Sequence, residues 1–558
     1  MSLAPFRILC LLLALIALLS VARTAAIGGM HFTDPTIPNN ANNFYSYTFS
    51  HFEPLSLYAT AAFFVGLCIY ARRGGQESLG LQRVVTSRRL PLYVALGVLL
   101  FAAVGRFWIH QNFDLCVDEY LNEFEAKILQ QHHIVAQVPA EWIGDVHAMN
   151  VAFQIYHGDA TQGYWASGFL PGTAFLNAVF DSLDLGWALA PVLAGSSILL
   201  LASLARRAFP DEAVLAANSA VLLLACSPQF LIMALTKFAW PVHLWGTLLW
   251  VWLFTHPNRF FFLLTPILGV CLIGLHQPQV HLLVAIPFLL RLLYTFRWRA
   301  MLWFGAWYLV GSWSWLHVLG ILRPTETGVG GDLRNLALPN LGFPFLLSVF
   351  ISTCHFITLY AWMTPILLPL VPIAVITWRM QPALVHDSIP AAAITFLFYL
   401  SFPHLQGHGW GYRFMHPAYG LLALAGAGGL VAWIRIYKTP LAVNALICSL
   451  LFSLIIQIPY RIYEVRAMVR PLSLAWAYIA SRPSDFVIVQ TSEFWYACDL
   501  IRNDPWLRQK PFVFDGQHLT DSQKADLARR GSVLTVGADE VRPFGVFISN
   551  PANVPTGD

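Results

Sequence analysis

The chain has 558 residues, of which 57% are hydrophobic and only 11% charged, against about 25% charged in typical soluble domains. The formal net charge of +4 is small, and no basic stretch with interleaved aromatic residues suggests nucleic acid as a partner. These properties exclude an ordinary soluble domain. Together with repeated apolar runs of about 16 to 22 residues, they indicate a helical protein that crosses the membrane many times.

The amino-terminal segment, 1–89, is expected to hold two transmembrane helices and a basic loop. The apolar run from Pro5 to Ala22 is either a cleavable signal peptide or an uncleaved first span, and we favour the span because further spans follow. A second span, Leu55 to Ala71, precedes a loop in which five arginines stand against the single acid Glu77. Because basic loops stay in the cytoplasm, this loop sets the orientation of the chain.

The span from Leu90 to Trp108 then crosses outward into an external first loop, 109–167. Within it, the stretch from Phe113 to Ile128, FDLCVDEYLNEFEAKI, is the densest acidic cluster in the chain. Its carboxylates are Asp114, Asp118, Glu119, Glu123 and Glu125. Adjacent acids at the mouth of a helix bundle favour a catalytic role. A solvated helix face, the ordinary fate of a charge run, is the alternative.

The segment 168–459 continues as alternating spans and loops. Segment 168–185 is apolar but interrupted by Pro171-Gly172, and the sequence leaves open whether it crosses the membrane or forms a juxtamembrane or re-entrant helix. Segment 345–362 is expected along the interface, before a crossing that ends at Trp378-Arg379. The clearer spans are Gly186 to Ala205, Ala213 to Leu235, Trp240 to Phe254, Phe260 to Leu275, Val280 to Tyr294, Leu302 to Leu322, Pro390 to Phe402, Ala418 to Trp433 and Leu441 to Pro459. We expect about thirteen crossings in all, with the amino end inside and the carboxyl end outside.

The last segment, 460–558, has a different composition. The stretches FVIVQ, PFVFD and SVLTVG are typical of buried strands, and Thr520 to Arg530 is expected to form a capped helix. This alternation predicts a small extracytoplasmic α/β domain. It contains no Gly-rich phosphate loop, so no nucleotide-binding role is expected.

Several stretches resemble the GT-C glycosyltransferases, in particular the protein-mannosyltransferase and aminoarabinose-transferase type that includes bacterial members. VDEYLNEFEAKIL resembles the Asp-Glu motif and helix of the family's first external loop, and SGFLPGTAFLNAVF resembles the Pro-containing helix after it. The long stretch from GWALAPV to SPQFL resembles the next two spans, and GHGWGYRFMHP resembles a late external loop. The resemblance covers 90–459, as the catalytic membrane domain. Many relatives carry an Asp near the position where this chain has Lys237.

The resemblance implies an all-α polytopic bundle of GT-C type. It implies that Asp118 is the catalytic base and that Glu119 tunes its pKa or orients the acceptor. The donor phosphate and sugar would be held by Arg413, Tyr412, His408 and Lys237. Interfacial anchoring of Trp, Tyr and Arg side chains, or snorkelling of Lys237, would explain the same residues structurally.

The expected function is transfer of a hexosyl or pentosyl group from a polyprenyl-phosphate sugar to an acceptor hydroxyl of a glycan, lipid or protein. The expected location is the bacterial inner membrane, with the active site outside the cytoplasm. The family implies no cofactor. The histidines of the first loop are irregularly spaced and no CxxC pair occurs, so no metal ligand set is assigned, and a divalent metal stays an alternative. A transporter or flippase and a non-catalytic scaffold are competing hypotheses for the function.

Overall fold

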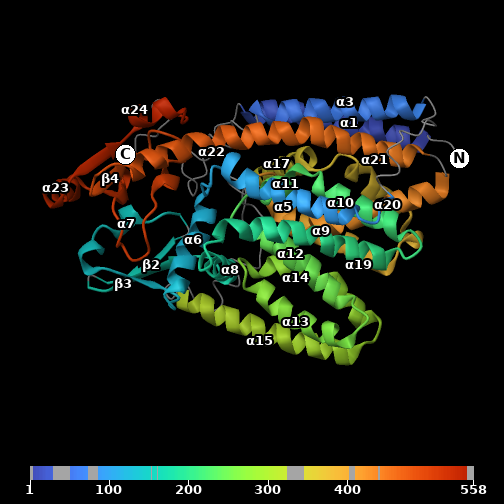
Figure 1. Ribbon diagram of the computed structural model, residues 1–558, viewed down its shortest axis with the longest axis horizontal. Coiled ribbons are helices and arrows are strands. Elements are labelled where there is room, and N and C mark those ends of the chain that lie inside the picture. The colour runs from blue at the N-terminus through green and yellow to red at the C-terminus, as the bar shows by residue number, and fades with distance from the viewer. Residues whose placement is uncertain are drawn as a thin grey trace.

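The computed structural model describes residues 4–28, 51–72, 86–152, 154–159, 161–322, 345–400, 409–437 and 440–548. Helices dominate these ranges, and most of the long ones run alongside one another as an elongated bundle (Figure 1). Several short helices and all six strands of these ranges gather at one end of this bundle, opposite the end marked N (Figure 1). The candidate catalytic segment lies where the bundle meets these shorter elements.

The bundle is built from helices that differ widely in length. They are α1 (Ala4–Gly28), α3 (Glu53–Arg72), α5 (Leu90–Trp108), α9 (Leu189–Ala208), α10 (Ala213–Ala225), α11 (Pro228–Met233), α12 (Ala239–Phe254), α13 (Arg259–Ile273), α14 (Pro278–Tyr294), α15 (Trp298–Leu322), α17 (Phe345–Trp362), α18 (Leu367–Ile376), α19 (Ala383–Leu400), α20 (Tyr419–Tyr437), α21 (Leu441–Phe452) and α22 (Ile458–Ala480). Small residues let the central α20 approach its neighbours: a Cβ at Gly429 would collide with the carbonyl oxygen of Leu370 on α18.

Seven helices in the described residues are long and apolar enough to cross a membrane, or eight if the bent pair α17–α18 is one span. The prediction of a polytopic membrane protein therefore stands, but the thirteen crossings are not confirmed. One reason is visible at Ala213 to Leu235, where the apolar run contains a turn. There, α10 ends at Ala225 and α11 begins at Pro228, a residue that suits the first turn of a new helix. An apolar run of this length therefore need not form one continuous helix.

Two segments that the sequence left ambiguous form short or bent helices. In segment 168–185, α8 (Gly172–Asp181) has 10 residues and is about 15 Å long, too short to cross a bilayer. It packs beside α6 (Val117–Gln130) at the end of the bundle. In segment 345–378, α17 and α18 meet at an angle of 103°, the geometry of a broken span or a re-entrant loop.

The last bundle helix runs further than the sequence predicts. A π-helical turn, Ser453–Gln457, joins α21 to α22, so that one apolar-to-amphipathic helix extends 40 residues, from Leu441 to Ala480. The domain boundary predicted at 460 therefore lies inside a helix. Pro459, which lacks a backbone N–H, lies just after the π-helical turn, where the regular α-helical hydrogen-bond pattern is interrupted. The long helix carries the chain from the bundle directly into the carboxyl-terminal sheet (Figure 1).

Two three-stranded sheets lie at this end of the molecule. The first is antiparallel, in the order β1 (Ala136–Val138), β3 (Gly163–Ser167), β2 (Gln154–Gly158). The second is parallel, in the order β5 (Phe512–Asp515), β4 (Phe486–Val489), β6 (Val533–Val536), and α23 (Asp521–Arg530) connects β5 to β6. The three strands of this second sheet and α23 fall in the segments that the sequence predicts for them. The three strands of the first sheet lie in the 109–167 loop, for which no strand was predicted. The short helices α7 (Val146–Met149) and α24 (Ala538–Val541) complete the region.

A buried ion cluster joins α3 to other helices of the bundle. Arg461 on α22 is fully buried and pairs with Glu53 of α3 at 2.7 Å and with Glu464 at 2.6 Å. Trp362 on α17 donates its indole N–H to Glu53 at 3.0 Å, and the Arg461 guanidinium lies 4.3 Å from the centre of its ring. This Arg461 cluster joins three helices that are far apart in the sequence.

Candidate active site

The acidic stretch forms α6, which begins just beyond the end of α5. Its apolar residues Leu121, Phe124 and Ile128 recur at helical spacing and are buried, so this face anchors the helix. Asp118 and Glu119 lie in its first turn, where the partial positive charge of a helix N-terminus favours carboxylates. The adjacent acids are therefore held at one end of a packed helix.

Arg106, in the last turn of α5, is the centre of a buried polar network. Its Nη2 donates to Asp114 Oδ1 at 2.5 Å, and its Nη1 lies 3.3 Å from His110 Nδ1. Nη1 also donates to the carbonyl oxygen of Leu235 at 3.1 Å and lies 3.7 Å from Glu119 Oε2. An arginine buried at a membrane edge needs such partners, because an unpaired buried charge is costly.

Glu119 points into this network rather than outward. Its side chain has no exposed surface, and its Oε2 accepts the backbone N–H of Lys237 at 2.8 Å. The Nζ of Lys237 donates to Glu123 Oε2 at 2.8 Å and lies 3.6 Å from Asp114 Oδ2. Asn122 adds a hydrogen bond to the carbonyl oxygen of Lys237 at 3.0 Å. Glu119 therefore fixes the backbone that presents the lysine.

Asp118 faces a different partner. Its Oδ2 lies 2.8 Å from Nη1 of Arg413, in the 3-10 helix η4 (Arg413–Ala418) that precedes α20. The Asp118 side chain is 12% exposed, whereas that of Glu119 is 0% exposed. The Arg413 guanidinium also lies over the rings of Phe238 and Phe414, at 5.1 and 5.7 Å. Of the two adjacent acids, Asp118 is therefore the less buried.

The surrounding charges and burial shift the pKa values of two carboxyls of this network in opposite directions. Burial raises the pKa of Asp114, but the Lys237, Arg106 and Arg502 cations outweigh it and hold the pKa below its usual value. Burial, reinforced by the charge of Asp114, raises the pKa of Glu119 well above its usual value, against Arg106 and Lys237. Asp114 is thus held charged, and Glu119 favours its neutral form.

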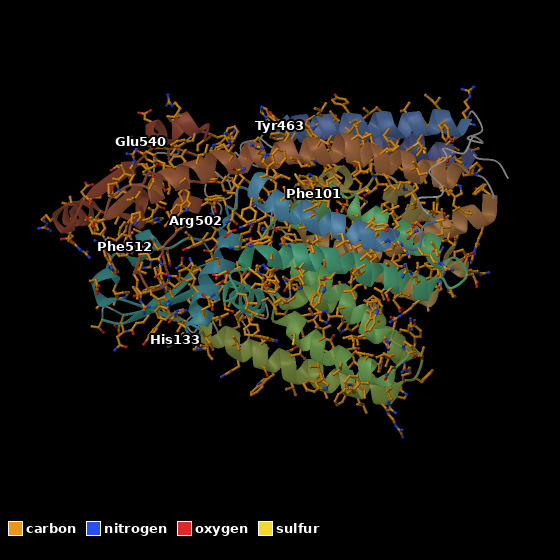
Figure 2. All side chains as sticks on the ribbon, in the orientation of Figure 1. Phe101, His133, Tyr463, Arg502, Phe512 and Glu540 are labelled. Atoms are coloured by element: carbon orange, nitrogen blue, oxygen red, sulfur yellow. The ribbon has the colours of Figure 1, made fainter. Side chains whose placement is uncertain are left out.

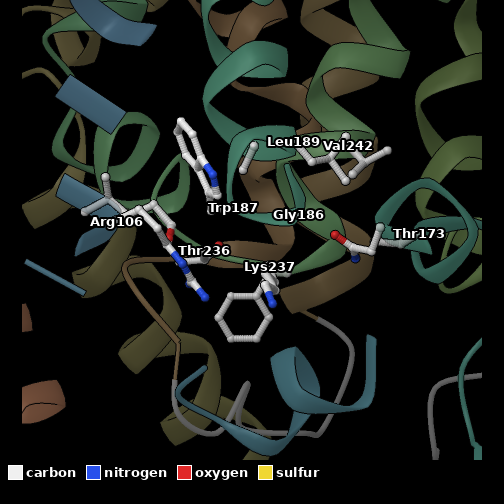
Figure 3. A pocket seen from close by; sticks show the side chains of 12 residues that line it. Arg106, Thr173, Gly186, Trp187, Leu189, Thr236, Lys237 and Val242 are labelled. Carbon is white, nitrogen blue, oxygen red and sulfur yellow. The ribbon is translucent and has the colours of Figure 1, made fainter. Parts of the chain in front are cut away.

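A small pocket opens beside the network (Figure 3). Its cationic residues are Arg106 and Lys237, and its apolar wall includes Trp187, Leu189 and Val242. The remaining lining residues are Thr173, Asn177, Gly186, Ala190, Leu235, Thr236 and Phe238. Cations beside an apolar wall form a surface suited to an anion that carries a lipid chain.

The structure brings four of the predicted site residues into one network or its edge: Asp118, Glu119, Lys237 and Arg413. Tyr412 lies elsewhere, with its ring fully buried and stacked on His355 at 4.7 Å. Its side chain is buried in the bundle core, and its role in holding the donor stays a prediction. His408 lies outside the described residues.

Two residues of the network were missed from the sequence, Arg106 and His110. Arg106 carried a usable signal, since a charge within an apolar span marks a functional or paired position. His110 lies 3.6 Å from Glu119 and 3.4 Å from the indole nitrogen of Trp410. Its contact with Trp410, 300 residues further along the chain, is one that no local pattern reveals. Among the described residues, no group of three or more His, Cys, Asp or Glu side chains is arranged to hold a metal ion.

No protein-family model and no curated protein matches the chain. Among solved structures it is similar to ArnT from Cupriavidus metallidurans bound to undecaprenyl phosphate, with 13% identity and a TM-score of 0.48 over 80% of this chain and 90% of that chain. It is also similar to the Archaeoglobus fulgidus oligosaccharyltransferase in the apo form, with 11% identity and a TM-score of 0.43 over 75% and 64%. With TM-scores below 0.5, these similarities decide nothing further, and the function is argued below from this chain's own residues.

Proposed function

We propose that this protein is a membrane glycosyltransferase that moves a sugar from a polyprenyl-phosphate donor to an acceptor hydroxyl on the extracytoplasmic face. One observation carries the proposal: the carboxylate of Asp118, the less buried of the two adjacent acids, pairs with Arg413 at the edge of a buried network whose cations Arg106 and Lys237 line a pocket. A base and a set of phosphate-binding cations are the two parts that this reaction needs.

Asp118 acts as the base. As the acceptor oxygen attacks the anomeric carbon of the sugar, its proton passes to the Asp118 carboxylate. The bond between the anomeric carbon and the phosphate oxygen breaks, and its electron pair leaves with the polyprenyl phosphate. Arg413, 2.8 Å from Asp118, holds the carboxylate in place until the acceptor enters. It then stands close enough to stabilise the negative charge that develops on the leaving phosphate.

The pocket receives the phosphate and the first part of the lipid. Lys237 is 16% exposed, so its ammonium is within reach of an entering anion. Burial lowers its pKa, but Asp114 and Glu123 outweigh this and hold the pKa above its usual value, so the side chain stays charged. Trp187 and Leu189 provide apolar contact for a prenyl chain next to the charge. Glu119 acts through Lys237, by holding its backbone N–H.

The finer assignments are part of the same proposal. The transferred group is a hexosyl or pentosyl unit, and the protein lies in a bacterial inner membrane with the 109–167 loop and the carboxyl-terminal unit outside the cytoplasm. The shared end of the bundle supports a common side for these two regions (Figure 1). The basic loop after α3 supports the choice of side.

The test uses purified protein in nanodiscs with radiolabelled polyprenyl-phosphate sugars and a panel of acceptors. Wild-type protein is expected to release polyprenyl phosphate, and Asp118→Asn to release at least a hundredfold less. Asp539→Asn, at an exposed acid of α24, is the control and is expected to match the wild type. Equal release by wild type and Asp118→Asn contradicts the role of Asp118.

A flippase or a scaffold would behave differently in the same preparation. A flippase moves the intact donor across the bilayer without releasing polyprenyl phosphate. A non-catalytic scaffold does neither. Movement of intact donor with no transfer to any acceptor overturns the transferase assignment in favour of transport.

A further inference from the structure

A segment of the carboxyl-terminal unit is bonded to the start of α6. Arg502 donates through Nη2 to the carbonyl oxygen of Asp114 and through Nε to the carbonyl oxygen of Asp499 at 2.7 Å. Its guanidinium lies 3.9 Å from the ring centre of Phe113 and 5.5 Å from that of Tyr120. Figure 2 labels Arg502 where the carboxyl-terminal elements meet the α6 region. One side chain thus holds both ends of the stretch 113–120.

The next residue, Asn503, extends this attachment. Its carbonyl oxygen accepts the hydroxyl of Tyr120 at 2.6 Å. Its side chain donates to the carbonyl oxygens of Val513, at 2.8 Å, and Met149, at 3.2 Å, and it accepts the N–H of Val513 at 2.9 Å. Asn503 therefore ties strand β5 to α6 and to the first external loop. Trp165 of β3 adds a bond to the carbonyl oxygen of Pro505 at 2.7 Å.

Asp499 places a buried carboxyl at the N-terminus of α6. It is 3% exposed and lies in the 3-10 helix η6 (Ala497–Leu500). Burial raises its pKa to about 7, against the Arg502 guanidinium and the backbone N–H of Val117, which lower it. The charge of Asp118 raises this pKa as well, so the two carboxyls interact at the first turn of α6. The segment 499–503 therefore contacts this turn through charge, hydrogen bonds and ring packing.

From these contacts we propose that segment 499–503 is a positioning element for the catalytic turn, with Arg502 as its main residue. Arg502 touches neither donor nor acceptor. It fixes the backbone from Phe113 to Tyr120, and so keeps Asp118 opposite Arg413 and Asp114 opposite Arg106. This inference rests on the proposed function for the meaning of Asp118, and it assigns to the carboxyl-terminal unit a part in the chemistry.

The test compares Arg502→Lys with Arg508→Lys. A lysine keeps the charge but lacks the planar fork that reaches the carbonyl oxygens of both Asp114 and Asp499. Arg508 is an exposed arginine of the same unit and serves as the matched control. We expect Arg502→Lys to lower kcat for sugar transfer at least tenfold, with KM for the donor changed less than threefold. Arg508→Lys is expected to leave both unchanged.

Hydrogen–deuterium exchange supplies a readout that does not depend on turnover. Arg502→Lys is expected to speed exchange in the peptide 113–122 at least fivefold, while the peptide from α10, 213–225, exchanges as in the wild type. Unchanged exchange in 113–122 overturns the positioning role, whether or not the protein transfers sugar. If exchange is faster in Arg502→Lys but the wild type transfers no sugar, the positioning role is retained and only the proposed function is contradicted.

A second variant distinguishes the positioning role from a general loss of folding. Tyr120→Phe removes only the hydroxyl that donates to Asn503. It is expected to lower kcat threefold or more and to speed exchange in 113–122, with a melting temperature close to that of the wild type. If Arg502→Lys does not fold, Tyr120→Phe alone tests the positioning role. A kcat and an exchange rate in Tyr120→Phe equal to those of the wild type overturn the inference.

Discussion

Two buried ion clusters lie in this bundle, and they differ in what can reach them. The Arg461 cluster is closed: its arginine is 0% exposed, its acids are 5% and 4% exposed, and Trp362 covers the guanidinium. The Arg106 network is open at its edge, where Lys237 is 16% and Glu123 is 29% exposed. Both join helices that are distant in sequence. Buried pairing alone therefore does not mark a site, whereas pairing beside a pocket does.

Removing the arginine of the closed cluster is expected to have the largest effect on stability. Arg461→Met leaves Glu53 and Glu464 buried without their cation, which costs about 3–5 kcal/mol. We expect a large loss of folded protein in detergent, measured by size-exclusion chromatography after heating. The triple variant Arg461→Met, Glu53→Gln, Glu464→Gln removes the uncompensated charge and is expected to recover most of the folded fraction. A stable Arg461→Met protein contradicts a structural role for the cluster.

The corresponding substitution in the Arg106 network is expected to weaken donor binding instead of the fold. Lys237→Met removes a cation of the pocket, so KM for the polyprenyl-phosphate donor should rise at least tenfold while the fold is retained. Lys127 also pairs with Glu123, at 3.0 Å, but its side chain is 42% exposed, so Lys127→Met is the control. Steady-state kinetics in nanodiscs measure both variants. An equal KM in Lys237→Met and the wild type contradicts the phosphate site.

A buried carboxyl outside both clusters tests the effect of burial alone. Glu125 of α6 is 1% exposed, and burial raises its pKa to about 8, against the N–H of Ser167, which lowers it. Its contribution to stability is present below the ordinary value of 4.5 and is lost as the pH rises through about 8. Each pKa unit corresponds to about 1.4 kcal/mol.

Glu125→Gln should therefore raise the melting temperature relative to the wild type at pH 9, with little difference at pH 4.5. The exposed Glu141 is the control, and Glu141→Gln should show no such dependence on pH. Thermal unfolding in detergent across this range checks the sign. A larger stabilisation at pH 4.5 than at pH 9 contradicts a buried, neutral Glu125.

Local patterns predicted much of the secondary structure. The predicted span from Leu90 to Trp108 has the bounds of α5, because apolar length and a proline near its start define it. The long helix α21–α22 was missed, since the composition changes at Arg461 although the backbone does not. Apolar length alone also did not reveal the turn between α10 and α11, which divides the run from Ala213 to Leu235.

Within the candidate site, the sequence indicated Asp118, Glu119, Arg413 and Lys237 by residue type and motif, but not how they pair. The contact between Asp118 and Arg413 joins α6 to η4, and that between Arg502 and Asp114 joins the carboxyl-terminal unit to the first loop. Such contacts depend on the packing of the whole bundle. The different exposure of the two adjacent acids is likewise set by tertiary structure and not by their order in the chain.

The most direct test of this account compares Asp118→Asn with Glu119→Gln in sugar transfer. Asp118 is the less buried acid and the proposed base, so its amide should lower kcat at least a hundredfold. Glu119 is fully buried and favours its neutral form, and glutamine can still accept the N–H of Lys237, so the loss should stay below about tenfold. Equal losses in the two variants, or a greater loss in Glu119→Gln, would contradict the assignment of Asp118 as the base.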